Sequence, residues 1–190
     1  MINSDEILKK LAIESNIRQE EIPDIDLYMD QVIQLFDSKF MKSLRNEEEK
    51  VLTKTMINNY AKGKLFIPIK NKKYSKEHIM LISMIYQLKG ALSINDIKAI
   101  LAPVNERIEK ENFDLESFYS TLIELQQKNI NNITDQIKIQ EHEIEMLEND
   151  DQLKQILFIS ALSNMSNAFR KAAEILVDDL LENNKKKGDK

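Results

Sequence analysis

The residues best suited to binding chemistry are lysines and asparagines gathered in one stretch, residues 50–76. Eight lysines and no Asp or Glu occur there, whereas the whole chain carries a net charge of −5. Lysine ammonium groups neutralise phosphates, and an asparagine side chain can form two hydrogen bonds with adenine in the major groove of DNA. This local positive charge indicates a nucleic-acid-binding surface. The alternative is a solvated, lysine-rich surface without a ligand.

The candidate DNA contacts form two groups, one on a predicted polar helix and one on a predicted β-hairpin that follows it. On the helix, Met56, Ile57 and Ala61 are expected to face inward, which leaves the polar residues outward. Asparagine would read bases, while lysine and tyrosine hydroxyl groups would mostly hold phosphates. The candidates are Lys54, Thr55, Asn58, Asn59, Tyr60, Lys62, Lys64, Lys70, Asn71, Lys72, Lys73 and Tyr74.

Patterns for catalysis and metal binding are weak. The chain has no cysteine, which excludes disulfides and thiolate sites, and its three glycines form no phosphate-binding loop. His78 is expected to cap a helix or to make a surface contact. His142 and Glu145 have a spacing that could hold a metal ion, but a solvated charged helix is the favoured interpretation. We therefore expect neither an enzyme nor a cofactor.

The elements that must position the basic stretch are predicted to be helices, because only three glycines and three prolines interrupt 190 residues. A first helix is expected after an N-cap at Ser4, and a second after a cap at Asp26. Apolar residues of the second helix recur at helical spacing, which predicts one buried stripe. They are Met29, Val32, Ile33, Phe36, Phe40 and Leu44.

The basic helix is expected to run from an N-cap at Thr53 to Gly63, which would take the left-handed conformation that ends many helices. Residues 65–69 are apolar and include Pro68, which predicts an edge strand. Residues 70–72 would form the tip of the hairpin, and Lys73 and Tyr74 its return strand.

Two further helices are predicted to close this unit. Ser75 would cap a helix over residues 76–88 that is apolar nearly all round and therefore buried. Ser93 and Asp96 form a near capping box that would open a helix over residues 94–101. Pro103 is expected to end that helix.

Beyond Pro103 the sequence predicts a hairpin of two long antiparallel helices. Apolar residues at coiled-coil-like spacing run from Phe118 to Leu147, with a phase slip at residues 129–132, and resume from Ile156 to Leu180. Residues 149–151 would form the turn. These stripes exceed what one hairpin can bury, so we expect a homodimer through the C-terminal helices. The alternative is an intramolecular bundle.

The chain is expected to be cytoplasmic. Its first residues, MINSDEILKK, lack the basic segment and apolar core of a signal peptide. The longest nearly apolar run, residues 79–88, is too short to span a bilayer.

Three segments resemble the MerR-type winged-helix domain: MINNYAKGKLFIP, KKYSKEHI and LKGALSINDIKAIL. Tyr60 matches a tyrosine at the end of that family's recognition helix, and Leu65 and Pro68 match the start of its wing. Tyr74 matches the return of the wing. Asn58 and Asn59 stand where arginine and tyrosine are typical, so the family's base preference is not carried over.

A more extensive resemblance is to a bacterial family catalogued as domain of unknown function 1836, which is grouped with MerR-like regulators. Its hallmarks are similar to IPDIDLYMDQV at residues 22–32, LTKTMINNYAK at 52–62 and KKYSKEHIMLISMIYQLK at 72–89. The resemblance implies transcription regulation. Metal-sensing MerR-like proteins rely on cysteines, which this chain lacks.

The expected fold is mainly α, with a winged helix-turn-helix, a small β-hairpin wing and a long C-terminal helical hairpin. Residues 1–23 would form an N-terminal arm, 24–103 the DNA-binding domain, 104–182 a dimerisation or effector region and 183–190 a disordered tail. The expected function is a sequence-specific regulator that binds double-stranded DNA. The alternative is an adaptor whose C-terminal helices bind a partner protein while the winged helix serves as scaffold.

Overall fold

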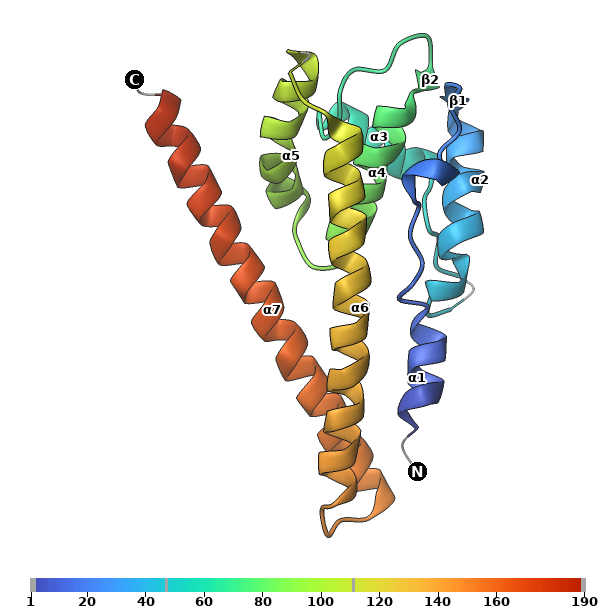
Figure 1. The fold of residues 1–190 in the computed structure, drawn as a ribbon, viewed down its shortest axis with the longest axis vertical. Helices are drawn as coiled ribbons and strands as arrows, with labels where there is room; N and C mark the ends of the chain where they lie inside the picture. Colours follow the sequence, from blue (N-terminus) through green and yellow to red (C-terminus); the bar gives the residue numbers. More distant parts are fainter. Residues whose placement is uncertain (1–2, 47, 111, 189–190) are drawn as a thin grey trace.

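The computed structural model describes residues 3–46, 48–110 and 112–188, which form a mainly α fold (Figure 1). Within these residues there are seven α-helices, two short 3₁₀ helices and one antiparallel pair of strands. In chain order they are α1 (Ser4–Leu11), η1 (Gln19–Glu21), β1 (Leu27–Tyr28), α2 (Met29–Phe40), η2 (Met41–Ser43), α3 (Lys54–Lys62), β2 (Lys73–Tyr74), α4 (Lys76–Leu88), α5 (Ile94–Glu109), α6 (Leu115–Glu145) and α7 (Asp151–Gly188).

The helix α4 lies at the centre of the main hydrophobic core. All of its residues from His78 to Ile85 are buried, as expected for a helix that is apolar nearly all round. Fully buried residues of α2, α3 and α5 belong to the same core, among them Phe36, Ile57 and Leu101. The prediction of a buried helix over residues 76–88 is therefore confirmed.

Tyr119 of α6 joins the long helix and the segment before η1 to this core. Its ring is fully buried, and its hydroxyl group donates to the carbonyl oxygen of Ile17 at 2.6 Å and is hydrogen-bonded to the hydroxyl of Ser83 at 2.9 Å. Burial raises the pKa of Tyr119 to about 12, so the hydroxyl stays protonated. The core thus reaches from Ile17 to Tyr119, beyond the predicted domain of residues 24–103.

A second, smaller core lies where α1 and the start of α7 pack against the far half of α6. Ile137, Ile144 and Phe158 are its buried residues. Ser4 fixes the start of α1, because its backbone N–H and its hydroxyl donate to the carboxylate of Glu141 at 2.8 and 2.5 Å.

The expected N-cap at Ser4 is wrong by one residue. Asn3 is the cap, and its side-chain oxygen accepts from the backbone N–H of Glu6 at 3.1 Å. Ser4 is instead the first residue of the helix, and its side chain bonds to Glu141, which is far away in the sequence.

The two long C-terminal helices form the predicted antiparallel hairpin, with its turn at residues 146–150. Figure 1 shows that α6 and α7 diverge from this turn. The helix α6 is continuous through residues 129–132, so the phase slip in the apolar pattern does not break it. The helix α7 continues to Gly188, so residues 183–188 are helical rather than disordered; residues 189–190 lie outside the described part of the chain.

Pro103 does not end α5, which runs on to Glu109. Proline within a helix removes one backbone hydrogen bond and costs about 3 kcal/mol. Leu101 is fully buried, and Val104 and Ile108 pack against the main core on either side of the proline. Burial of this apolar stripe offsets the cost of the proline. At the start of the same helix, the predicted capping box of Ser93 and Asp96 is confirmed.

The start of α2 also differs from the prediction. Tyr28, rather than Asp26, occupies the N-cap position, and its backbone N–H donates to the side chain of Gln31 at 2.8 Å. Leu44 lies after η2 and outside the helix, although it still packs against the core.

Within the described residues, no helix combines the length and apolar character needed to cross a bilayer.

The glycine that follows α3 is required for space rather than for a left-handed backbone. Gly63 has a φ of −71°, and it is Lys64 that is left-handed, with a φ of 57°. A Cβ atom on Gly63 would lie 2.7 Å from a methyl carbon of the buried Leu65 and 3.1 Å from the carbonyl oxygen of Asn59. The close approach of the chain after α3 therefore depends on the missing side chain.

We expect Gly63→Ala to lower the free energy of unfolding by about 1–2 kcal/mol, because Leu65 must move within a packed core. Gly90→Ala is the matched control, since a Cβ there meets no atom within 4 Å. The control should leave stability unchanged or raise it by up to about 1 kcal/mol. Equal losses in chemical denaturation would contradict this account of Gly63.

Candidate nucleic-acid interface

The helix α3 has one exposed polar side. Its start is as predicted, because the hydroxyl of Thr53 accepts from the backbone N–H of Met56 at 3.1 Å. Ile57 and Tyr60 are buried and hold the helix against the core. The helical period places five polar residues on the opposite side, and all five are exposed: Lys54, Thr55, Asn58, Asn59 and Lys62.

A tight turn at Lys70–Lys73 presents further cations. The backbone N–H of Lys73 donates to the carbonyl oxygen of Lys70 at 3.0 Å, while Asn71 and Lys72 have φ values of 52° and 59°. Two successive left-handed residues are typical of the type I′ turns that close β-hairpins. The predicted tip of the hairpin is therefore confirmed.

The predicted edge strand over residues 65–69 is wrong. The strand β2 pairs instead with β1, so that Leu27 lies opposite Tyr74 and Tyr28 opposite Lys73. Leu65 and Phe66 are buried in the main core. This burial directs the segment toward the core instead of along β2. A strand of two residues such as β1 carries too little pattern to be found in the sequence.

His78 joins the start of α4 to the segment before the turn. Its Nδ1 accepts from the backbone N–H of Ser75 at 3.1 Å, and its Nε2 lies 3.2 Å from the carbonyl oxygen of Ile67, to which it donates. The rings of Phe66 and Tyr74 meet the imidazole edge-on, with centroids 5.7 and 5.9 Å away. The predicted capping role is confirmed, but the side chain is buried rather than at the surface.

The structure brings most of the candidate DNA contacts to the surface around α3 and the turn. Lys64, Lys70, Asn71 and Lys72 are exposed, and Lys73 is half-buried with its ammonium group 5.3 Å from the ring centroid of Tyr28. The prediction that Tyr60 and Tyr74 contact DNA must be corrected, because only 6% and 2% of their surfaces are exposed. Burial raises the pKa of both hydroxyl groups, and both rings belong to the core.

Two residues beside this surface were not among the candidates predicted from the sequence. The carboxylate of Asp30, at the start of α2, lies 2.8 Å from the ammonium group of Lys54. Tyr28 is 56% exposed and lies next to Lys73. Neither belongs to the basic stretch, so only the packing of α2 and β1 against it places them here.

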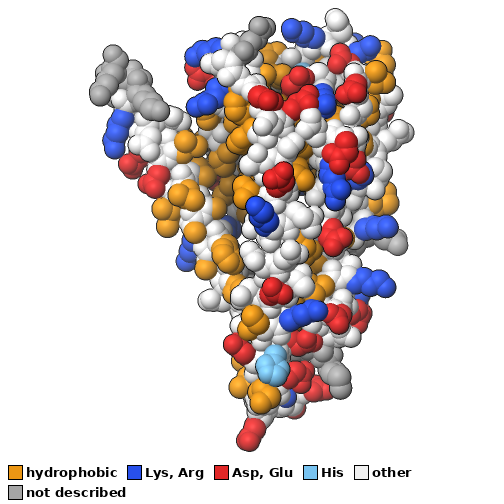
Figure 2. Space-filling model, viewed as in Figure 1, with side chains coloured by type: hydrophobic (Ala, Val, Ile, Leu, Met, Phe, Trp, Pro, Cys, Tyr) orange, Lys and Arg blue, Asp and Glu red, His pale blue; other side chains and the backbone are white. Residues whose placement is uncertain are grey.

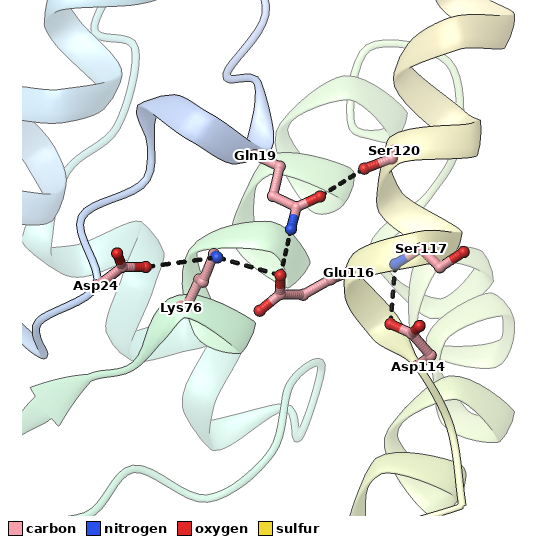
Figure 3. A network of polar contacts seen from close by, with 7 residues as sticks. All are labelled: Gln19, Asp24, Lys76, Asp114, Glu116, Ser117 and Ser120. Atoms are coloured by element: carbon pink, nitrogen blue, oxygen red, sulfur yellow. Dashed lines mark hydrogen bonds and ion pairs between the residues drawn. The ribbon is translucent and has the colours of Figure 1, made fainter.

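Lys76, the last lysine of the basic stretch, belongs to an internal network (Figure 3). Its ammonium group lies 3.5 Å from the carboxylate of Asp24 and 3.2 Å from that of Glu116. Gln19 donates to Glu116 and accepts from the hydroxyl of Ser120, which joins η1, α4 and α6. The hydrogen bond to Glu116 raises the pKa of Lys76. This cation holds the fold together and is not directed toward a ligand.

No cluster of three or more potential metal ligands occurs within the described residues. His142 and Glu145, the weak candidate pair, are both exposed on α6. The surface around α3 offers cations, amides and one aromatic ring, which suit binding to a polyanion.

The sequence profile of a family described as Domain of unknown function (DUF1836) matches residues 17–122. The chain belongs to this family. The matched segment contains α2, α3, α4, α5 and the main core, together with the first residues of α6. No curated protein and no solved structure matches the chain.

The buried state of His78 predicts a pH-dependent stability. Burial lowers the pKa of His78 below 6.5, so the unfolded chain takes up this proton first as the pH falls. The stability that the buried, neutral His78 contributes is therefore complete above about pH 6.5, and it is lost as the pH drops through the lowered pKa of this residue.

We expect His78→Gln to show a smaller loss of stability between about pH 7.5 and 5.5 than the natural chain, measured by denaturant unfolding at each pH. His142→Gln is the control, because His142 is exposed and is the other of the two histidines. A pH profile that is unchanged in His78→Gln would rule out this role.

Proposed function

We propose that the protein is a sequence-specific, DNA-binding transcription regulator of the MerR-like winged-helix type. In this proposal α3 enters the major groove of double-stranded DNA and the Lys70–Lys73 turn acts as the wing. The observation that carries it is the exposed polar side of α3 beside the exposed lysines of the turn. Cations on a helix and on an adjacent hairpin are the expected footprint of such a reader.

The two parts of this surface would have different tasks. Asn58 and Asn59 are exposed on α3 and carry the amide groups that can recognise adenine. Lys62, Lys64 and the lysines of the turn would hold phosphates, which fixes the register of the helix on the duplex. Lys54 would exchange its ion pair with Asp30 for a phosphate, and exposed ion pairs of this kind contribute at most about 1 kcal/mol.

The proposal predicts that reversing charge in the turn reduces the salt dependence of DNA binding. Each phosphate contact contributes about 0.9 to the slope of log K against log salt, so Lys72→Glu/Lys73→Glu should lower its magnitude by up to about 1.8 and weaken binding. The control is Lys9→Glu/Lys128→Glu, which changes the net charge equally at exposed positions on α1 and α6. If both double variants weaken binding equally, only overall charge matters.

The second prediction separates base recognition from phosphate binding on α3. Asn58→Ala should remove discrimination at one base pair, worth about 1–3 kcal/mol, while binding to unrelated DNA changes little. Lys62→Ala should weaken all sequences alike. The measurement is a selection of genomic DNA fragments by the purified chain, followed by titrations of single-base variants of the enriched site. A uniform loss in Asn58→Ala would exclude its role in base recognition.

The same selection tests the alternative role as an adaptor. An enriched motif that is lost in Lys72→Glu/Lys73→Glu supports the regulator. Binding without enrichment, abolished by modest salt, would leave non-specific attraction to the lysines and would contradict the proposal. In that case the basic surface would be expected to bind an acidic protein, and random DNA would not compete with it.

A further inference from the structure

Tyr28 is an exposed aromatic residue beside the cations of the turn. Of the five tyrosines, it alone is more than half exposed, at 56%. Tyr60, Tyr74 and Tyr119 are buried, and Tyr86 is half-buried. At the end of the molecule where β1 and β2 lie, Figure 2 shows hydrophobic as well as Lys or Arg side chains at the surface. Tyrosine hydroxyl groups are among the common donors to DNA phosphates, so the position of this side chain matters.

The pairing of the two strands fixes the direction of Tyr28. Side chains alternate along a strand, and directly opposite residues of an antiparallel pair lie on the same face. Leu27 and Tyr74 are opposite each other and buried, so the next pair, Tyr28 and Lys73, lies on the outer face. The outer face of this short ribbon therefore presents one aromatic ring and one ammonium group.

The ring of Tyr28 holds the ammonium group of Lys73. The ammonium nitrogen lies over the ring, 5.3 Å from its centroid. This cation–π contact uses the face of the ring, and the ring of a phenylalanine would also make it. The hydroxyl group, at the edge of the ring, takes no part in it. The contact with Lys73 therefore accounts for the ring of Tyr28 but not for its hydroxyl group.

Tyr28 also lies between the two parts of the proposed interface. Asp30, two residues further on, is 2.8 Å from the ammonium group of Lys54 at the start of α3. Lys73, opposite Tyr28, belongs to the turn. A DNA strand that contacts both α3 and the turn would therefore pass beside Tyr28. The carboxylate of Asp30 repels phosphate, which favours a contact on the Lys73 side of the ring.

We infer that Tyr28 is a further DNA-contacting residue, which donates its hydroxyl hydrogen to a phosphate of the strand between α3 and the turn. Its ring at the same time directs Lys73 toward the same stretch of backbone. The contact positions the duplex and reads no base, because phosphates carry no direct sequence information. The inference deepens the proposed function and rests on it, since it presupposes DNA binding.

The first test compares Tyr28→Phe with the natural chain in titrations of a synthetic duplex that carries the site enriched in the selection. One hydrogen bond to a charged group is lost, so binding should weaken about 10-fold. The salt slope should be unchanged, because no cation is removed, and the enriched motif should stay the same. Tyr28→Ala should weaken binding further, since it also frees Lys73.

Met41→Ala is the control for the loss of an exposed apolar side chain. Met41 is 60% exposed and lies in η2, which follows the other end of α2. This variant should bind the duplex as tightly as the natural chain does.

The second test detects the contact without a substitution. Tetranitromethane nitrates exposed tyrosine rings beside the hydroxyl group, so Tyr28 should react first in the full chain, as measured by peptide mass spectrometry. Saturation with the same duplex should abolish this early nitration of Tyr28. The slower reaction of Tyr86 is the internal reference and should not change, because Tyr86 packs against Phe40 at the far end of α2.

The outcomes separate this inference from the proposed function. Equal affinity of Tyr28→Phe and the natural chain, or nitration of Tyr28 that the duplex does not slow, would overturn the inference while DNA binding itself stands. A changed motif in Tyr28→Phe would indicate base recognition in place of the phosphate contact and would overturn it as well. A natural chain that binds no duplex would contradict the proposed function, and the inference would fall with it.

Discussion

A helix that is buried on every side needs apolar partners all round, and α4 imposes this requirement on the rest of the chain. Ile79, Leu81 and Ile82 are essentially inaccessible, so α2, α3, α5 and α6 must surround them. Two buried polar side chains of this helix are satisfied by specific partners. His78 bonds to Ser75 and Ile67 near the start, and Ser83 bonds to Tyr119 further along. The position of the basic surface follows from these contacts, because α3 and the turn pack on the same core.

Electrostatics divides the lysines of the basic stretch into two groups. Lys76 is committed to the network with Asp24 and Glu116, and Lys54 is paired with Asp30. No acid occurs within the stretch itself, and the lysines at the end of α3 (Lys62 and Lys64) and at the turn (Lys70 and Lys72) are exposed to solvent, whereas Lys73 is half-buried. The exposed lysines at the end of α3 and on the turn are therefore available to a polyanion, whereas Lys54 would first have to leave Asp30. This arrangement favours phosphate contacts there over the start of the helix.

The chain beyond the family segment forms its own smaller core. The match to DUF1836 ends at residue 122, within α6, whereas α1, the rest of α6 and α7 lie outside it. These elements meet around Ile137, Ile144 and Phe158. Because α6 is one continuous helix, it joins this smaller core rigidly to the main core through Tyr119.

The sequence by itself determined the helical class, the buried character of α4, the polar side of α3 and the turn at Lys70–Lys73, because each depends on local periodicity, capping or turn chemistry. Tertiary structure decided what depends on contacts between distant residues. It extended α5 through Pro103 by burying Val104 and Ile108, paired β2 with a strand of two residues, and moved Ser4 from a cap to Glu141. Tertiary packing also buries Tyr60 and Tyr74 in the core and pairs Asp30 with Lys54. Local patterns specify which side of an element is apolar, whereas only the packed chain specifies which partner covers it.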